Sequence, residues 1–322
     1  MRAGEGSGRL IYGAPNEHDE GNDMRIGIGI GGSTVDEVLA QTERAASDGF
    51  TSGWLSNIFG LDAITAIAIA GRHVPGIHLG TAVVPTFPRH PHALAQQAMT
   101  AWDATRGHFT LGIGLSHQVV IETMFGLSFD KPATHMREYL SVLLPLLREG
   151  NVSFDGELYR VHAPLERAGD PSGPPVLLAA MAPVMLRLAG EVADGTILWM
   201  TGARTVADHV APRINKAAAD AGKPAPEIVA ALPVAVTADI ERARQQAAKT
   251  FAVYGTLPSY RAMLDREGAA GPEDIAIVGD EETVTAGIRA LGEAGVTEFN
   301  ASCFGDGETI RRTVDLLRGF AR

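Results

Sequence analysis

The sequence predicts a (β/α)8 barrel, and two observations carry this prediction. Short apolar and β-branched runs alternate with amphipathic stretches of helical period, and eight such strand–helix units fit into about 300 residues. The first strand is followed by no good dinucleotide fingerprint, which weakens the main rival, a doubly wound sheet with a second domain. The chain has 322 residues, 45% of them hydrophobic, which is enough for the core of one large domain.

The glycines near the N-terminus are the only support for that rival fold. In the segment GIGIGGSTVDE, Gly27, Gly29 and Gly32 formally match the pattern GxGxxG. However, Gly27 and Gly29 lie inside the predicted strand rather than in the turn after it. No acidic residue clearly ends a second strand at the expected distance. We therefore interpret these glycines as part of a barrel strand.

The expected strands are short segments rich in Ile, Val and Leu, each followed by Gly, Pro, Ser or Asn. They occupy residues 25–30, 52–56, 76–84, 109–114, 176–180, 196–200, 228–236 and 297–303. The expected helices occupy residues 34–47, 62–72, 92–105, 134–149, 183–193, 205–221, 239–254, 283–294 and 308–320. Ser33 or Thr34 can cap the first helix, ahead of Asp36 and Glu37.

Two segments interrupt the alternation. After the fourth strand, the helix 134–149 is followed by VSFDGELYRVH at 152–162, which predicts a hairpin that turns at Asp155-Gly156. Residues 257–271 predict an irregular or helical insertion. We therefore expect a single barrel domain over residues 24–322 with a helix-plus-hairpin insertion after strand 4. Residues 1–23, rich in glycine and polar residues, are expected to form a flexible extension.

Charge and composition exclude several classes of partner. The net charge of −11, with no basic run, argues against nucleic acid and anionic membranes, because binding phosphates requires clustered Lys and Arg. No segment has the apolar length of a membrane span, and the first residues lack the apolar core of a signal peptide. The single cysteine, Cys303, fits a reducing, cytoplasmic environment, and we interpret it as a small buried side chain rather than a nucleophile.

In a barrel of this kind, the active site lies at the carboxyl ends of the strands. The residues expected there are small, apolar or hydroxyl-bearing, with few acids and no set of ligands with metal-site spacing. The segment LGIGLSH at 111–117 ends in Ser116 and His117, but adjacent side chains diverge, so the pair cannot act as nucleophile and base unaided. Such a ring of residues fits a site where a bound cofactor carries the chemistry.

Several segments resemble the luciferase-like monooxygenase superfamily, in its branch of coenzyme F420-dependent oxidoreductases. They are IHLGTAVVPTFPRHPHALAQQAMTAWDATRGHFTLGIGLSH, FDKPATHMREYLSVLLPLLREGNVSFDGELYRV and LLAAMAPVMLRLAGEVADGTILWMTG. The similarity runs from Met24 to near the C-terminus. It implies a TIM barrel with a large insertion that binds a deazaflavin, or flavin, and transfers a hydride.

The resemblance also implies roles for individual strand ends. In the family, a non-prolyl cis peptide after the third strand supports the deazaflavin ring, and the matching pair here is Ala82-Val83. Many relatives have an Asp-His pair after the second strand, whereas this chain has Ser56-Asn57. Neither residue is a proton donor at neutral pH. Asn57 is expected to hydrogen-bond the ring or substrate, with a structural turn as the alternative.

Further cofactor contacts are expected from three other strand ends. Thr201-Gly202-Ala203-Arg204 corresponds to the family's phosphate-binding turn, and its hydroxyl, backbone amides and Arg suit an anion. The small residues of Ala180-Met181-Ala182 let a flat ring approach the backbone, although Met181 also suits core packing. Leu115, Ser116 and His117 are expected to contact the cofactor tail or the substrate.

The resulting expectation is an F420-dependent oxidoreductase that moves a hydride between the deazaflavin C5 and a small organic substrate. An activated C=C or C=N bond suits a site whose proton donor is His117, Tyr260 or water. The alternatives are an FMN-dependent monooxygenase of the same superfamily and a non-catalytic flavin- or deazaflavin-binding barrel. The resemblance implies a homodimer, and the Ala-rich helices at 63–70 and 93–101 are candidates for close packing against a partner.

Overall fold

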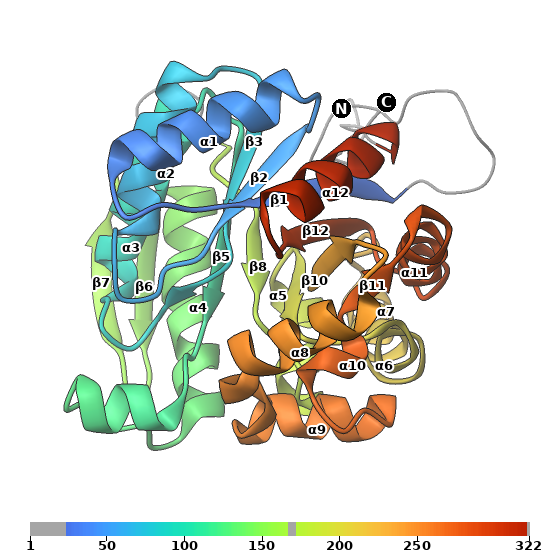
Figure 1. The fold of residues 1–322 in the computed structure, drawn as a ribbon. Helices are drawn as coiled ribbons and strands as arrows, with labels where there is room; N and C mark the ends of the chain where they lie inside the picture. The colour runs from blue at the N-terminus through green and yellow to red at the C-terminus, as the bar shows by residue number, and fades with distance from the viewer. Residues whose placement is uncertain (1–23, 167–171, 321–322) are drawn as a thin grey trace, which may run out of the picture.

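The computed structural model of the protein describes residues 24–166 and 172–320, and the predicted extension 1–23 lies outside them. Eight parallel strands form a closed barrel, because the last strand pairs with the first (Figure 1). In spatial order they are β1 (Arg25–Ile30), β2 (Ser52–Leu55), β3 (His78–Thr81), β5 (Phe109–Gly114), β8 (Val176–Leu178), β9 (Gly195–Trp199), β10 (Glu227–Val236) and β12 (Glu298–Cys303). The predicted fold class is confirmed.

Helices cover the outside of this barrel. They include α1 (Val35–Ser47), α2 (Ala63–His73), α3 (Pro91–Ala104), α5 (Pro183–Val192), α11 (Glu281–Glu293) and α12 (Gly307–Phe320). After β9 the helical segment is continuous through α6 (Ala203–Thr205), η2 (Val206–Val210) and α7 (Ala211–Asp220). Of the two predicted caps for α1, Thr34 is the one used, since its hydroxyl accepts the Glu37 N–H at 3.2 Å.

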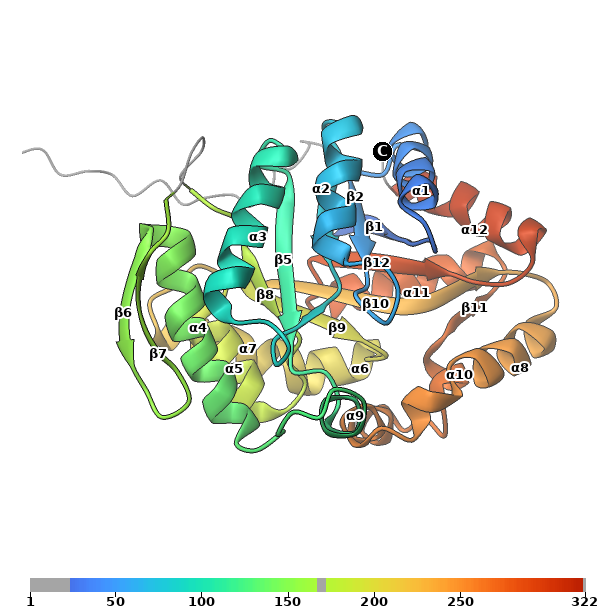
Figure 2. The same ribbon diagram turned by 90° about the vertical axis from the view of Figure 1, so that its left-hand side faces the viewer.

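The insertion after β5 contains the predicted helix and hairpin. It comprises η1 (Val120–Met124), α4 (Pro132–Glu149) and the antiparallel strands β6 (Asn151–Asp155) and β7 (Arg160–Pro164). The helix α4 and the two strands lie together on one flank, at the left of Figure 2. The carboxylate of Glu138 on α4 accepts the backbone N–H groups of residues 157, 158 and 159 at 2.7–2.9 Å. These bonds satisfy the backbone N–H groups in the turn of the hairpin and hold the turn against α4.

The third strand is not the single strand predicted over 76–84. It ends at Thr81, and the short β4 (Val84–Pro85) rejoins β5 after a cis peptide between Ala82 and Val83. The Thr81 hydroxyl donates to the Gly112 carbonyl and accepts the Gly112 N–H, both at 2.8 Å. The side chain thus replaces the ladder bonds that the departing backbone gives up.

The segment after β10 also differs from the prediction of one helix over 239–254. It contains α8 (Ile240–Thr250), η3 (Ala252–Gly255), α9 (Pro258–Glu267), α10 (Pro272–Ile275) and β11 (Ile277–Gly279), which pairs with β10. A three-residue strand gives too little periodicity to be recognised in a sequence. In both views α9 lies beyond the end towards which the β5 arrow points (Figures 1 and 2).

Most of the alanines considered as a dimer surface are part of the subunit core. Ala66 and Ala70 on α2 are 1% exposed, and Ala95 and Ala98 on α3 are fully buried. These small side chains pack into the subunit's own core, where α2 and α3 contact each other. The buried alanines are therefore not available to a partner, whereas Ala93 is exposed and Ala68 is half-buried, and the dimer stays a prediction.

The inside of the barrel is packed around Trp54, which forms a cluster with Leu177, Ile197 and Val229. Glycines make room for this large ring. A Cβ added at Gly80 would lie 2.3 Å from the Trp54 ring, and one at Gly27 would lie 3.1 Å from its Nε1. Of the glycines in the formal GxGxxG pattern, Gly27 thus serves barrel packing.

Candidate functional site at the barrel mouth

The carboxyl ends of the eight strands bring most of the predicted site residues to one end of the barrel, here called the mouth. The inner wall near the mouth carries small residues. A Cβ added at Gly114 would lie 2.9 Å from Val83 and 3.1 Å from the Ala179 side chain, so the ends of β3, β5 and β8 meet there. Gly29 and Ala231 lie at inward-facing positions of β1 and β10.

A row of aromatic contacts spans the mouth. The ring of His117 after β5 lies 5.6 Å from that of Tyr260 on α9, and Tyr260 lies 5.0 Å from Tyr254 on η3. Tyr254 in turn lies edge-on to Trp199 at the end of β9, at 5.7 Å. Sequence reasoning identified His117 and Tyr260 but missed Tyr254 and Trp199, because no pattern showed that η3 lies over β9.

Burial keeps the ionisable groups of this row uncharged. It lowers the pKa of His117 below its usual value and raises the pKa of both Tyr254 and Tyr260. At neutral pH, His117 is therefore a neutral imidazole with one N–H and one lone pair, and both phenols keep their protons. The row offers hydrogen-bond donors and acceptors without a fixed charge.

Ser56 holds the peptide that precedes Val83. Its hydroxyl donates to the carbonyl oxygen of Ala82 at 2.9 Å, and the Ala82 N–H donates to the Leu55 carbonyl at 2.9 Å. The cis peptide expected at Ala82-Val83 is thus present and is fixed by the end of β2. Its contact with a ring stays a prediction.

Asn57 is largely engaged in local structure. Its side-chain oxygen accepts the Ala63 N–H at the start of α2 at 3.0 Å and lies 3.4 Å from the Arg89 guanidinium. Arg89 also forms an ion pair with Asp62, the capping residue of α2. The structural turn that the sequence left as an alternative is therefore observed. A catalytic role for Asn57 stays a prediction. It depends on the N–H groups of the side-chain amide, because the side-chain oxygen is already hydrogen-bonded.

The predicted phosphate turn already holds an anion from the protein itself. The carboxylate of Glu267 accepts the N–H of Arg204 at 3.2 Å, the N–H of Thr205 at 2.7 Å and the Thr205 hydroxyl. Thr201 donates instead to the Trp199 carbonyl, and the exposed Arg204 lies 3.7 Å from Asp208. These donors of the turn are therefore used by Glu267, and phosphate binding at this turn stays a prediction.

The backbone at Met181 is fixed by a histidine that sequence reasoning missed. His209 on η2 donates from Nε2 to the Met181 carbonyl at 2.7 Å, and burial lowers its pKa. Its other ring nitrogen, Nδ1, is buried with no hydrogen-bond partner among the residues described. Nothing in the sequence pointed to His209, because its partner belongs to a different strand–helix unit.

Asn300 is a second missed residue, and the sequence did contain a signal for it. On β12 it shares the inward face with Glu298, whose carboxylate reaches Trp54 inside the barrel. Asn300 is 5% exposed, and its side-chain oxygen has no hydrogen-bond partner in the described part of the chain. Attention to strand ends alone overlooked a polar residue on the inner face of a strand.

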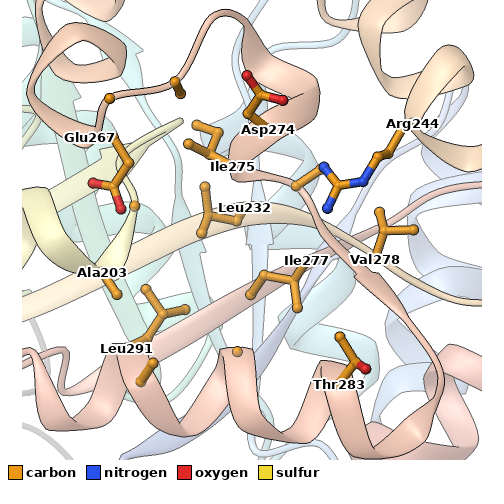
Figure 3. A pocket seen from close by; sticks show the side chains of 16 residues that line it. Ala203, Leu232, Arg244, Glu267, Asp274, Ile275, Ile277, Val278, Thr283 and Leu291 are labelled. Carbon is orange, nitrogen blue, oxygen red and sulfur yellow. The ribbon is translucent and has the colours of Figure 1, made fainter. Parts of the chain in front are cut away.

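A cavity of about 450 Å³ lies outside the barrel, behind the turn at Gly202. Its walls come from β10, β11, α11 and the segment from α9 to α10 (Figure 3). Most of its lining is aliphatic, with Glu267 at one side and Arg244 at the other (Figure 3). The Arg244 guanidinium donates to the Glu273 carbonyl at 2.8 Å.

Three further observations concern metal binding, membrane insertion and the reactivity of the cysteine. Within 24–166 and 172–320, no cluster of three or more His, Cys, Asp or Glu residues could hold a metal ion, and no helix is long and apolar enough to cross a membrane. Burial raises the pKa of the Cys303 thiol to about 12, so this cysteine is not poised as a nucleophile.

Comparison with known proteins places this chain in a family. The family model described as luciferase-like monooxygenase matches residues 14–298, and the chain belongs to that family. A 5,10-methylenetetrahydromethanopterin reductase of Archaeoglobus fulgidus is 27% identical over 229 residues, which are 70% of this chain and 67% of the relative. A Mycobacterium tuberculosis protein named as a coenzyme F420-dependent oxidoreductase is 30% identical over 193 residues, 53% and 54% of the two chains.

The fold has a similar solved counterpart. The coenzyme F420-dependent tetrahydromethanopterin reductase of Methanopyrus kandleri superposes with a TM-score of 0.77 at 22% identity. The superposition covers 92% of this chain and 97% of that one. At this identity the likeness establishes the shared fold.

Proposed function

We propose that the protein is a coenzyme F420-dependent oxidoreductase of a small organic substrate. The deazaflavin, when bound at the mouth, supplies C5 as the donor or acceptor of a hydride. The carrying observation is the mouth itself, where small residues and the Ala82-Val83 cis peptide form a wall beside an uncharged row of aromatic residues. The names of similar proteins support this choice of cofactor.

The residues of the mouth have distinct parts in this proposal. Asn300 offers its unpartnered carbonyl oxygen to an N–H of the ring or substrate. The aromatic row excludes water from one side of the bound ring. His117 and Tyr260 hold protons at an imidazole N–H and a phenol O–H, next to the position expected for the substrate. Reduction of an activated C=C or C=N bond suits this set, because it requires one proton besides the hydride.

The test is turnover with reduced coenzyme F420. Purified protein is mixed with reduced F420 and a panel of enones and imines, and the recovery of deazaflavin absorbance is followed. We expect oxidation of F420 that depends on both protein and substrate. Failure to bind or oxidise the deazaflavin contradicts the proposal.

An FMN-dependent monooxygenase is the second candidate, favoured by the description of the family model. Oxygen consumption with reduced FMN, in the presence of candidate substrates, distinguishes it from the first. A cytoplasmic homodimer is also proposed on family resemblance, and light scattering of the purified protein tests its oligomeric state.

A further inference from the structure

We propose that Glu267 determines cofactor specificity by acting as an internal anion in place of a cofactor phosphate. This inference rests on the proposed function only in that the mouth binds a flavin or deazaflavin ring. Its consequence is that the ring governs affinity, and a phosphate on the tail adds little. Removing the charge of Glu267 opens the anion position and creates a preference for phosphorylated forms.

The first argument concerns the hydrogen-bond donors of the turn. Each donor that is observed to face Glu267 is already hydrogen-bonded to its carboxylate. The N–H groups of Arg204 and Thr205 and the Thr205 hydroxyl all donate to the Glu267 carboxylate. Thr205 is 1% exposed, so its hydroxyl is committed to protein partners. A phosphate that needs the same donors binds only after Glu267 has left, because two anions cannot share three donors without repulsion.

The second argument is that the backbone is shaped around this carboxylate. A Cβ added at Gly202 would lie 2.4 Å from Cδ of Glu267, a distance that no real side chain tolerates. Any residue except glycine at position 202 would push Glu267 out. The close approach and the three donors are separate features of the same position, and together they indicate a built contact.

The third argument is electrostatic and concerns the location of Glu267. It is the last residue of α9, where the negative end of the helix dipole disfavours a carboxylate. The contact is therefore not explained by α9 itself. It is explained by the start of α6, whose exposed N–H groups favour an anion. Glu267 also ties α9, which carries Tyr260, to the end of β9.

The test compares riboflavin with FMN, which differ only in the phosphate, as ligands of wild type and Glu267→Gln. Glutamine keeps the shape and one acceptor but removes the charge. We expect wild type to bind the two with affinities within about threefold, and E267Q to prefer FMN by about tenfold or more. The control is Glu273→Gln, which removes a carboxylate of α10 for which no contact with the amides of α6 is observed among the described residues.

A second measurement is independent of ring binding. Inorganic phosphate is added at constant ionic strength, and the thermal midpoint is followed for wild type, E267Q and Glu267→Ala. We expect phosphate to raise the midpoint of the two variants and not that of wild type or E273Q.

The outcomes separate this inference from the proposed function. Ring binding with equal riboflavin-to-FMN ratios in all variants, and no phosphate effect, overturns the role of Glu267 and leaves the proposed function intact. A wild type that already prefers FMN strongly also overturns it. No binding of riboflavin, FMN or coenzyme F420, together with phosphate stabilisation confined to the Glu267 variants, contradicts the proposed function and supports the anion position.

Discussion

The two ends of the barrel treat buried polar groups in opposite ways. At the end where the strands begin, the fully buried Glu298 carboxylate accepts from Trp54 Nε1 and the Ser52 hydroxyl, both at 2.6 Å, and from Arg25 at 3.3 Å. Asn300 lies inside the barrel on the same strand, two residues closer to the mouth, and its side-chain oxygen has no partner among the described residues.

The difference separates stability from function within one strand. A buried carboxylate is tolerated only when it is paired and hydrogen-bonded, so the network around Glu298 is a structural requirement. An unpaired buried acceptor costs stability and needs another reason to persist. In a barrel whose site lies at the carboxyl ends of its strands, the reason we propose is a ligand.

The largest expected effect comes from breaking the network at the start of the strands. Glu298→Ala leaves the buried Trp54 N–H and the Ser52 hydroxyl without this acceptor, whereas Arg25 keeps its ion pair with Glu227. We expect the free energy of unfolding to fall by about 3–5 kcal/mol, because each unsatisfied buried donor is costly. Urea denaturation followed by tryptophan fluorescence measures it. Glu43→Ala, an exposed carboxylate on α1, is the control and should change stability by less than about 0.5 kcal/mol. A loss as small as that of the control would refute the structural role.

The second effect is a pH dependence on the mouth side of the molecule. Burial lowers the pKa of His135, which contacts the Thr86 hydroxyl at 2.9 Å, to about 4. Between pH 6.5 and 4 the unfolded chain binds this proton and the folded chain does not, so stability falls as the pH falls through that window. We expect this effect to lower the free energy of unfolding by up to about 3 kcal/mol at pH 4, with no such loss above pH 7.

Comparison with His135→Gln isolates this contribution. Stability curves of wild type and the variant, measured by denaturation from pH 7.5 to 4, should converge as the pH decreases. Parallel curves across that range would show that His135 protonates normally in the folded protein.

The third effect concerns activity rather than stability. Asn300→Ala removes the unpartnered acceptor, and we expect kcat/KM to fall by about tenfold, equivalent to about 1.4 kcal/mol, with the thermal midpoint unchanged or raised. Asn151→Ala, on the exposed strand β6, serves as the matched control. If N300A instead lost stability and kept its activity, the contrast between the two ends would not hold.

The smallest effect is expected at Ser56, which acts on the bound ring through the Ala82 carbonyl. Ser56→Ala removes the hydrogen bond to the Ala82 carbonyl, worth about 1 kcal/mol, and should weaken ring binding by about fivefold. Ser56→Thr keeps the hydroxyl and should restore binding. Equal weakening in both variants would point to steric effects and against positioning of the peptide.

The barrel and the ring of strand ends could be predicted because they depend on local pattern. Apolar runs and helical periods repeat eight times. The hairpin was also predicted, although its turn occupies residues 156–159, because Asp155 still pairs with Arg160 at the end of β6. The break in the third strand was visible only by family resemblance, since Thr81 replaces bonds that belong to the neighbouring strand. The three-residue β11 left no pattern long enough to recognise.

What the sequence by itself determined is which residues end the strands, and therefore which groups can reach the mouth. Only the tertiary structure decided what each group meets there. Glu267 lies 62 positions from Thr205 along the chain, yet the two residues are hydrogen-bonded. Tyr260 on α9 likewise contacts His117 in the loop after β5. Such pairings depend on how α9 packs across strand ends, and no local periodicity encodes contacts between segments so distant in sequence.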